Sequence, residues 1–291
     1  MTKFGIDVSK WQGSDFDFAK AKAEGVEFVI LRGAYSTGKD LQFENYYAKC
    51  KALKLPVGVY HYSMATTVEE AKKEAEFLYN KVLKGKQFEL PIYIDVEDKV
   101  QLALSKTLLT DIVKAWCGYL EARKYFVGIY AGKYTFRDQL HDDQLKSYTH
   151  WVAMWSRNCT YEDKSVLGMW QFGGEKNELR STKIAGKTVD QDCMFVDFPS
   201  IIKREKLNGF GNTVSSGATK PVIAEETFSK GDKVMITSDA KYSNGKSVPL
   251  WVRKTKLYVR SDELAGGYYN VSILKVGAIT GKVHKKYLKK V

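Results

Sequence analysis

Short runs of apolar and β-branched residues recur eight times in the first 200 residues of the chain. They cover residues 4–11, 28–35, 57–64, 90–98, 125–132, 150–156, 168–174 and 187–195. Four segments with helical spacing separate the first five runs, at residues 17–25, 44–55, 66–83 and 105–124. Alternation of strand and helix with short loops predicts βα units and a parallel sheet.

Eight strands over about 200 residues fit a (β/α) barrel at the short end of its size range. The connections after the fifth run are too brief and irregular for full helices. We therefore predict an α/β fold over residues 1–206, an irregular (β/α)5β3 TIM-like barrel. A doubly wound open sheet is the alternative, but its Gly-rich phosphate loop has no counterpart here.

After residue 206 the hydrophobic pattern divides the chain into two further segments. Residues 207–226 are rich in Gly, Ser and Thr with little periodicity, which is typical of a linker. Residues 227–291 contain short alternating runs at 230–236, 250–260, 268–274 and 278–284, separated by turn signals. This pattern predicts a small all-β domain, SH3-like in its proportions.

The charge follows the same division. The chain has 291 residues and a formal net charge of +12, and ten of these charges belong to residues 206–291. Such a basic segment favours contact with polyanions. Nucleic acid, anionic wall polymers and acidic lipids are all compatible with the charge alone.

Several classes of protein are disfavoured by what the sequence lacks. No apolar run reaches the 18 residues of a membrane span, and the N-terminus has no apolar segment of a signal peptide, so we expect synthesis in the cytoplasm and no membrane insertion. The four cysteines have no CxxC spacing and the histidines no ligand spacing. We therefore expect reduced thiols, no metal and no cofactor. The sequence contains no GxSxG motif, which disfavours an enzyme that transfers acyl groups through a serine nucleophile.

We expect every barrel strand to bring its C-terminal end to one mouth, where the active sites of such barrels lie, and polar residues collect at these ends. They are Asp7, Arg32, Tyr60, His61, Tyr62, Asp95, Glu97, Tyr130, Trp155, Trp170, Gln171, Asp190 and Asp192. Crowded carboxylates repel one another, which raises the pKa of at least one of them. A carboxyl group that stays protonated near neutral pH can serve as a general acid. For His61, between two tyrosines, a core role is favoured over a substrate-orienting one.

The stretch LPIYIDVEDK, residues 90–99, contains the sharpest local signal. Asp95 and Glu97 are two residues apart, so on a strand both point to one face while Val96 points to the other. Asp98 falls just beyond the strand and is interpreted as a solvent-facing residue. Two carboxyl groups on one face match a glycosidase pair. A solvated strand end is the alternative, and the acids Asp7 and Asp190 at the same mouth favour the pair.

Six motifs occur in the order of a known family: GIDVSKWQG, RGAY, VGVYHY, DVE, MWQF and VDQD. Over residues 1–200 the chain resembles the glycoside hydrolase family 25 lysozymes. The resemblance implies a barrel of five βα units followed by three strands. It also implies hydrolysis of the β-1,4 bond between N-acetylmuramic acid and N-acetylglucosamine in peptidoglycan.

The resemblance assigns roles to individual positions. Glu97 resembles the proton donor, and Asp95 the acid that orients the 2-acetamido group or stabilises charge. Asp7 and Asp190 match the other catalytic-site carboxylates. Tyr60, Tyr62, Trp155 and Gln171 resemble the family's substrate-contact positions. From their places at the strand ends, Arg32, Tyr130 and Asp192 are also expected to contact substrate, although Asp192 stands where Asn is common. Substrate-assisted retention through the acetamido carbonyl is the preferred mechanism.

The C-terminal segment resembles the SH3-type wall-binding domains appended to such enzymes. Its lysines and arginines alternate with aromatics in WVRKTKLYVR and VHKKYLKK, which suits an anionic wall polymer; a neighbouring wall hydrolase disfavours nucleic acid. The layout resembles a phage endolysin, which accumulates in the host bacterial cytoplasm before lysis and acts at the wall. The alternatives are a bacterial autolysin, a non-catalytic wall-glycan-binding protein, and a chitinase, whose DxxDxDxE pattern is missing.

Overall fold

The first unit of the chain is a barrel of eight strands with two short β attachments. One is β3 (Gly38–Lys39), which pairs antiparallel with the end of the second barrel strand, and the other is a hairpin of β9 (Lys183–Ile184) and β10 (Lys187–Thr188). A computed structural model describes residues 2–211, 228–237, 240–273, 275 and 279–291. The barrel strands are β1 (Lys3–Val8), β2 (Phe28–Tyr35), β4 (Val57–Tyr62), β5 (Ile92–Asp95), β6 (Val127–Gly132), β7 (Thr149–Ala153), β8 (Leu167–Gly173) and β11 (Asp190–Met194). Their order is β1-β11-β8-β7-β6-β5-β4-β2, and pairing of β1 with β2 closes the barrel. The predicted barrel fold is confirmed.

The last strand runs against all the others. Neighbouring strands from β1 through β8 pair in parallel, whereas β11 pairs antiparallel with both β8 and β1. The expectation that every strand brings its C-terminal end to one mouth is therefore wrong for the eighth strand. Its N-terminal residue, Asp190, lies at the mouth opposite Asp7.

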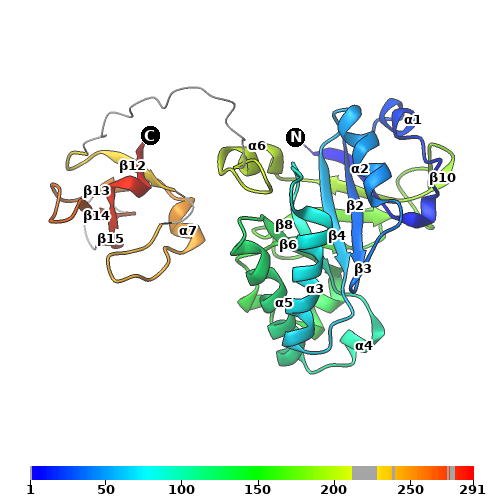
Figure 1. Cartoon of the computed structure of the whole chain (residues 1–291), viewed down its shortest axis with the longest axis horizontal. Coiled ribbons are helices and arrows are strands. Elements are labelled where there is room, and N and C mark those ends of the chain that lie inside the picture. Colours follow the sequence, from blue (N-terminus) through cyan, green and yellow to red (C-terminus); the bar gives the residue numbers. More distant parts are fainter. Residues whose placement is uncertain (1, 212–227, 238–239, 274, 276–278) are drawn as a thin grey trace. The chain divides into compact units, whose positions relative to one another are not determined.

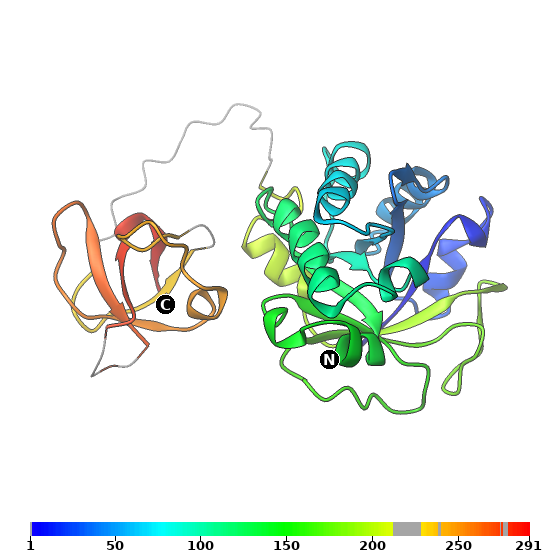
Figure 2. The same ribbon diagram turned by 90° about the horizontal axis from the view of Figure 1, so that it is seen from below.

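Helices cover the outside of the wall between the early strands (Figures 1 and 2). They are α1 (Phe18–Ala23), α2 (Phe43–Ala52), α3 (Val68–Leu78), α4 (Lys99–Leu102) and α5 (Lys106–Glu121). Polar caps set the starts of the two longest, because Thr67 accepts from the N–H of Glu70 and Ser105 from that of Leu108. After β6 the chain forms only short turns, η3 (Thr135–Gln139) and η4 (Asp142–Gln144), before β7. The irregular second half was predicted.

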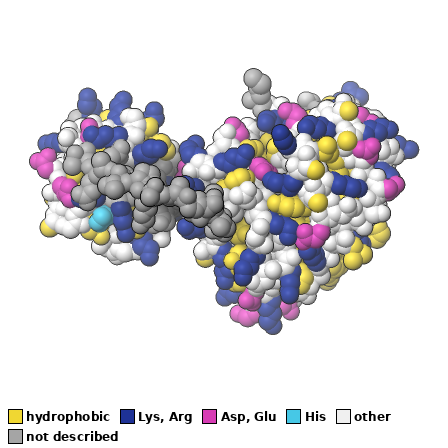
Figure 3. Space-filling model, turned by 45° about the horizontal axis from the view of Figure 1, so that its top comes forward, with side chains coloured by type: hydrophobic (Ala, Val, Ile, Leu, Met, Phe, Trp, Pro, Cys, Tyr) yellow, Lys and Arg dark blue, Asp and Glu magenta, His cyan; other side chains and the backbone are white. Residues whose placement is uncertain are grey.

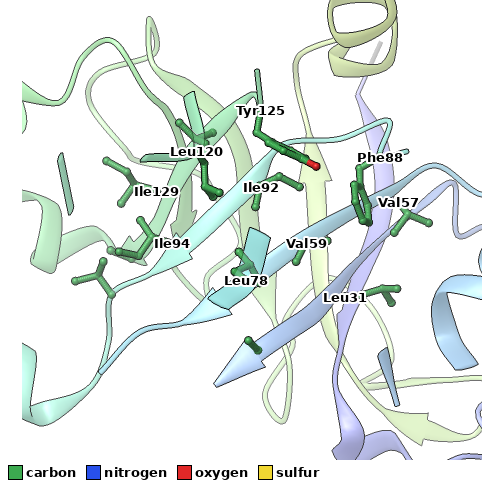
Figure 4. Packing of buried hydrophobic residues seen from close by; sticks show 14 of the residues in the cluster. Leu31, Val57, Val59, Leu78, Phe88, Ile92, Ile94, Leu120, Tyr125 and Ile129 are labelled. Carbon is green, nitrogen blue, oxygen red and sulfur yellow. The ribbon is translucent and has the colours of Figure 1, made fainter. Parts of the chain in front are cut away.

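Alternation along each strand produces two hydrophobic layers. Leu78 of α3 and Leu120 of α5 belong to the outer layer together with outward-pointing strand residues such as Ile92 and Ile94 (Figure 4). A separate cluster fills the barrel interior, with Phe28, Ile30, Tyr93, Trp151 and Met169 among its members. Val96 is fully buried in the outer layer, as its predicted orientation requires. Inward positions near the mouth are the polar ones.

The barrel unit extends further along the chain than predicted. After α6 (Phe198–Arg204), the Asn208 side chain is fully buried, accepts from the N–H of Phe126 and donates to the carbonyl of Leu90. Residues 207–211 therefore belong to the barrel rather than to the linker. The rest of the predicted linker, residues 212–226, lies outside the described residues.

The second unit has its own five-stranded antiparallel sheet and its own core. The strands are β12 (Lys233–Ile236), β13 (Leu257–Val259), β14 (Tyr268–Ser272), β15 (Gly281–His284) and β16 (Leu288–Lys290), in the order β15-β14-β13-β12-β16. The run at 250–260 was predicted as one strand, but it begins with the helical turn α7 (Leu250–Arg253). A small β domain is confirmed.

Lysine and arginine side chains are spread over both units on the face shown in Figure 3. Within the described parts of the chain, no helix is both long and apolar enough to cross a membrane.

Candidate active site

A hollow of about 260 Å³ opens at the mouth of the barrel, where the C-terminal ends of the early strands meet the start of β11. Eleven residues line it: Asp7, Val8, Ser9, Trp11, Gln12, Arg32, Tyr60, Tyr62, Asp95, Glu97 and Asp190. Strand alternation explains the set, because inward positions of β1, β2, β4, β5 and β11 supply most of it. All four predicted catalytic carboxyl groups are brought together here.

Asp95 and Glu97 enter the hollow from the end of β5. Asp95 is buried, and its Oδ1 atom has no hydrogen-bond partner among the described residues. Its pKa is well above the usual range because of burial and the neighbouring Glu97, which Arg32 only partly offsets. Glu97 is exposed at the rim, yet the surrounding walls desolvate its carboxyl group and Asp98 adds repulsion, so its pKa is raised as well.

The opposite wall carries the second pair of acids. Burial, then repulsion from Asp190 and Asp192, raises the pKa of Asp7 well above its usual range. Burial, followed by the charge of Glu97, raises the pKa of Asp190 to about 6. Acids from both walls therefore act on one another across the hollow.

Arg32 forms an ion pair with Asp40, a residue that the sequence analysis did not single out. Its Nε atom donates to Oδ2 of the buried Asp40 at 2.8 Å, and the N–H of Lys10 donates to the same oxygen at 3.1 Å. Asp40 therefore fixes both Arg32 and the turn after β1 that carries Trp11.

Three predicted substrate contacts lie beneath the hollow rather than in its lining. Tyr130 and Gln171 are buried, and the Tyr130 hydroxyl donates to Gln171 Oε1 at 3.0 Å. Asp192 is fully buried, with Oδ1 accepting from Trp151 Nε1 at 2.8 Å. Antiparallel β11 carries Asp192 inward from the mouth and out of the lining of the hollow, so its predicted contact with substrate stays a prediction. Burial raises its pKa well above the usual range.

Trp155 lies outside the hollow's lining and is 43% exposed, with Nε1 donating to Gln171 Oε1 at 3.1 Å. Sequence reasoning missed four lining residues: Val8, the last residue of β1, Ser9, which caps the following 3-10 turn η1 (Lys10–Gln12), and Trp11 and Gln12 within that turn. The tryptophan in GIDVSKWQG could have pointed to these residues, because it lies just beyond the end of the first strand and large aromatic side chains there suit sugar rings. In the structure Trp11 is 76% exposed.

Two neighbouring residues have structural roles. His61 is fully buried on the outer side of β4, with Nδ1 accepting from Trp116 Nε1 at 2.9 Å and Nε2 at 2.9 Å from the Ser36 carbonyl. The core role is confirmed. Asp98 is not a merely solvating residue: it caps α4 through the N–H of Val100 and accepts from the Tyr62 hydroxyl at 3.1 Å. Among the described residues, no group of three or more His, Cys, Asp or Glu could hold a metal ion.

Known proteins resemble this chain over its barrel unit. The model of the glycosyl hydrolases family 25 matches residues 6–179, which is more than half of the chain. The chain belongs to this family. The matched residues run from within β1 past the end of β8, whereas β11 and the second unit lie beyond them.

Relatives of the family differ in how much of them the chain covers. It is 29% identical over 165 residues to the autolytic lysozyme of Clostridium acetobutylicum, which is 56% of this chain but only 48% of that protein. The chain thus spans about half the length of this curated relative. Solved structures show the shared fold. The modular autolysin of Streptococcus pneumoniae matches with a TM-score of 0.58 at 22% identity. The match covers 67% of this chain and 47% of the autolysin. The catalytic domain of an endolysin from a Listeria monocytogenes bacteriophage matches with a TM-score of 0.57 at 22% identity. That match covers 70% of this chain and 98% of the endolysin domain.

Proposed function

We propose that the chain is an N-acetylmuramidase, which hydrolyses the β-1,4 bond between N-acetylmuramic acid and N-acetylglucosamine in peptidoglycan. The observation that carries this proposal is the pair Asp95 and Glu97, two carboxyl groups that line one hollow with raised pKa values. Membership of a glycoside hydrolase family supports it.

Glu97 is the proposed proton donor. It is accessible at the rim, and its raised pKa keeps a fraction protonated at a pH where free glutamate is ionised. A general acid requires this property, since it must hand a proton to the glycosidic oxygen as the bond breaks.

Asp95 is the proposed partner acid. Asp95 lines the hollow, where its carboxyl group would orient the 2-acetamido group of the sugar. The acetamido carbonyl oxygen then attacks the anomeric carbon while the glycosidic bond breaks and Glu97 protonates the departing oxygen; water, deprotonated by Glu97, afterwards opens the oxazolinium ring. Asp7 and Asp190 complete the acidic wall opposite. Tyr60, Tyr62 and Trp11 offer rings to the glycan.

The proposal is tested by the Glu97→Gln variant on purified bacterial walls. We expect activity to fall about 10²–10⁴-fold, the usual contribution of a general acid. Wall binding and the circular dichroism spectrum should stay unchanged. Glu69→Gln, an exposed acid in the first turn of α3, is the matched control and should keep full activity.

Mass spectrometry of the wild-type products identifies the bond. Muramic acid at the new reducing ends is the expected result. Glucosamine there would contradict the muramidase assignment, and wall binding without any new reducing ends would leave a non-catalytic glycan-binding protein.

The proposal extends to a role as an endolysin that accumulates in the host bacterial cytoplasm and reaches the wall during lysis. Similarity of the barrel to a phage endolysin domain supports this role, while the relative named autolytic lysozyme keeps the autolysin alternative open. Expression inside a bacterial host distinguishes them. An endolysin should lyse the cells only when a separate membrane pore is supplied, whereas lysis without a pore favours the autolysin.

The second unit is the proposed wall-binding domain, of SH3 type, with an anionic wall polymer as its ligand. Its sheet forms a meander whose last strand, β16, returns through a 3-10 turn to pair with β12. The outward positions of this sheet include Tyr258, Tyr268, Lys233, Lys282 and Lys289. Binding of the full chain to walls should weaken with salt and with chemical removal of the polymer. Binding indifferent to both would contradict an anionic ligand.

A further inference from the structure

Gln171 of β8 is buried beneath the hollow and forms three side-chain hydrogen bonds. Its Nε2 atom donates to Asp7 Oδ2 at 2.9 Å. Its Oε1 atom accepts from the Tyr130 hydroxyl at 3.0 Å and from Trp155 Nε1 at 3.1 Å. One amide therefore joins a buried carboxyl group of β1 to a half-exposed indole that follows β7.

The chemistry of these partners fixes which way the amide points. An indole N–H can only donate a hydrogen bond, so the group facing Trp155 must be the oxygen of Gln171. The NH₂ group then faces Asp7, and Asp7 Oδ2 must accept from it. A proton on Asp7 consequently resides on Oδ1, the oxygen that Gln171 leaves free.

Gly174, directly after β8, supplies the room for this arrangement. A Cβ atom at this position would collide with Oδ1 of Asp190 and would lie 2.8 Å from the Trp155 ring. The Trp155 ring thus packs against a position without a side chain, and its N–H edge is held by Gln171. Its remaining surface is the part left open to solvent.

We infer that Gln171 is a positioning residue and not the substrate contact that the sequence suggested. It holds Asp7 in one orientation and fixes the Trp155 indole, so that an exposed ring able to stack on a sugar is coupled to a buried acid. The inference rests on the proposed function for its substrate, a glycan, but its geometry does not depend on that function.

Several charged and titratable side chains face Asp7, and its pKa in the pH–activity experiment described below depends on them together. Those that face it are Asp190 and Asp192 of β11, Asp95 of β5, and the phenols of Tyr60 in β4 and Tyr130 in β6, with the Arg32 guanidinium of β2 in the same hollow. The hydrogen bond donated by Gln171 favours the ionised form of Asp7, as a positive charge such as that of Arg32 also does, whereas the neighbouring carboxylates favour the protonated form.

The Gln171→Met variant tests this role, since methionine has a similar volume and no hydrogen-bonding amide. Loss of the donated bond should raise the pKa of Asp7 further, and the limb of the pH–activity profile that reports its ionisation should move up by about one pH unit. We expect kcat/KM on purified walls to fall about tenfold. The second readout needs no activity: the ¹⁵N–¹H signal of the Trp155 indole, assigned with Trp155→Phe, should shift and exchange faster with water.

Gln191→Met is the matched control. Gln191 of β11 is also a fully buried glutamine, but it faces the outer side of the wall, and its amide donates to the Ser181 carbonyl and not to an acid. It should lower stability without moving the pH limb or the Trp155 signal. Should Gln171→Met fail to fold, Gln171→Glu keeps the shape, places a second acid against Asp7 and should also move the limb upward.

A folded Gln171 variant with an unmoved pH limb and an unchanged Trp155 signal would overturn the inference. So would a control variant that reproduces both changes, because the effect would then be general loosening of the core. A double-mutant cycle with Trp155→Phe completes the test, and non-additive losses are expected. If the wild type cleaves no wall at all, the proposed function fails, while the indole signal still decides whether Gln171 holds Trp155.

Discussion

Strand β4 separates two clusters of buried polar side chains that are built in opposite ways. On its outer side, Glu74 accepts hydrogen bonds through both oxygens, from the Ser63 hydroxyl at 2.6 Å and from the N–H of Met64 at 3.1 Å. Both ring nitrogens of His61 also have partners. The acid and the imidazole of this outer cluster are thus paired, as buried groups in most proteins are, although Oε1 of the adjoining Gln101 has no hydrogen-bond partner among the described residues.

The inner cluster, at the barrel mouth, leaves its acids short of partners. Asp95 Oδ1 and Asp192 Oδ2 are buried without hydrogen bonds among the described residues, and both carboxyl groups have strongly raised pKa values. Such an arrangement costs stability unless a ligand supplies the missing partners. The contrast teaches that burial of a polar group does not mark a site by itself; crowding of poorly paired acids around a hollow does.

Between these two clusters, the largest expected effect comes from Asp95→Asn in the inner one. Asparagine keeps the shape but removes a buried charge that Glu97 repels. We expect activity on walls to fall about 10²-fold or more, while the free energy of unfolding stays unchanged or rises. Chemical denaturation and initial rates of wall clearing measure the two quantities. A variant that is both active and less stable would place Asp95 with the structural residues instead.

Glu74→Ala in the outer cluster should do the reverse. It leaves the Ser63 hydroxyl and the Met64 N–H without an acceptor inside the protein, so we expect a loss of about 3 kcal/mol in unfolding free energy. Specific activity of the folded protein should change only a few-fold. Glu74→Gln, which keeps one acceptor, should recover part of the stability. An inactive but fully stable Glu74→Ala protein would erase the distinction between the two clusters.

Local periodicity was enough to predict much of this molecule. The order of strands and helices, the shared face of Asp95 and Glu97, and the outward side of Val96 all follow from spacings of two or about four residues. The alternation works because a strand exposes successive side chains to opposite sides whatever its neighbours are.

Long-range pairing was not visible in the same way. Nothing within the residues around Asp190 shows that β11 runs antiparallel, because strand direction is decided by its pairing with β1 and β8. This reversal buries Asp192 and keeps Asp190 at the mouth. The link between Gln171, Asp7 and Trp155 likewise joins three distant parts of the chain, and Asp40 beside Arg32 is a tertiary partner of the same kind.

The smallest expected effect concerns Asp98, which touches the inner cluster from its edge. Its charge raises the pKa of Glu97, so Asp98→Asn should lower that pKa. A general acid must be protonated to act, and the alkaline limb of the activity profile should therefore move down by about half a pH unit. Asparagine can still accept from the N–H of Val100, so α4 should keep its cap. The shift should shrink in high salt, since the Asp98 side chain is partly exposed. Glu69→Gln, far from the site, is the control and should leave the alkaline limb in place. If Asp98→Asn also leaves the limb in place, solvent already screens the charge of Asp98, and burial alone raises the pKa of Glu97.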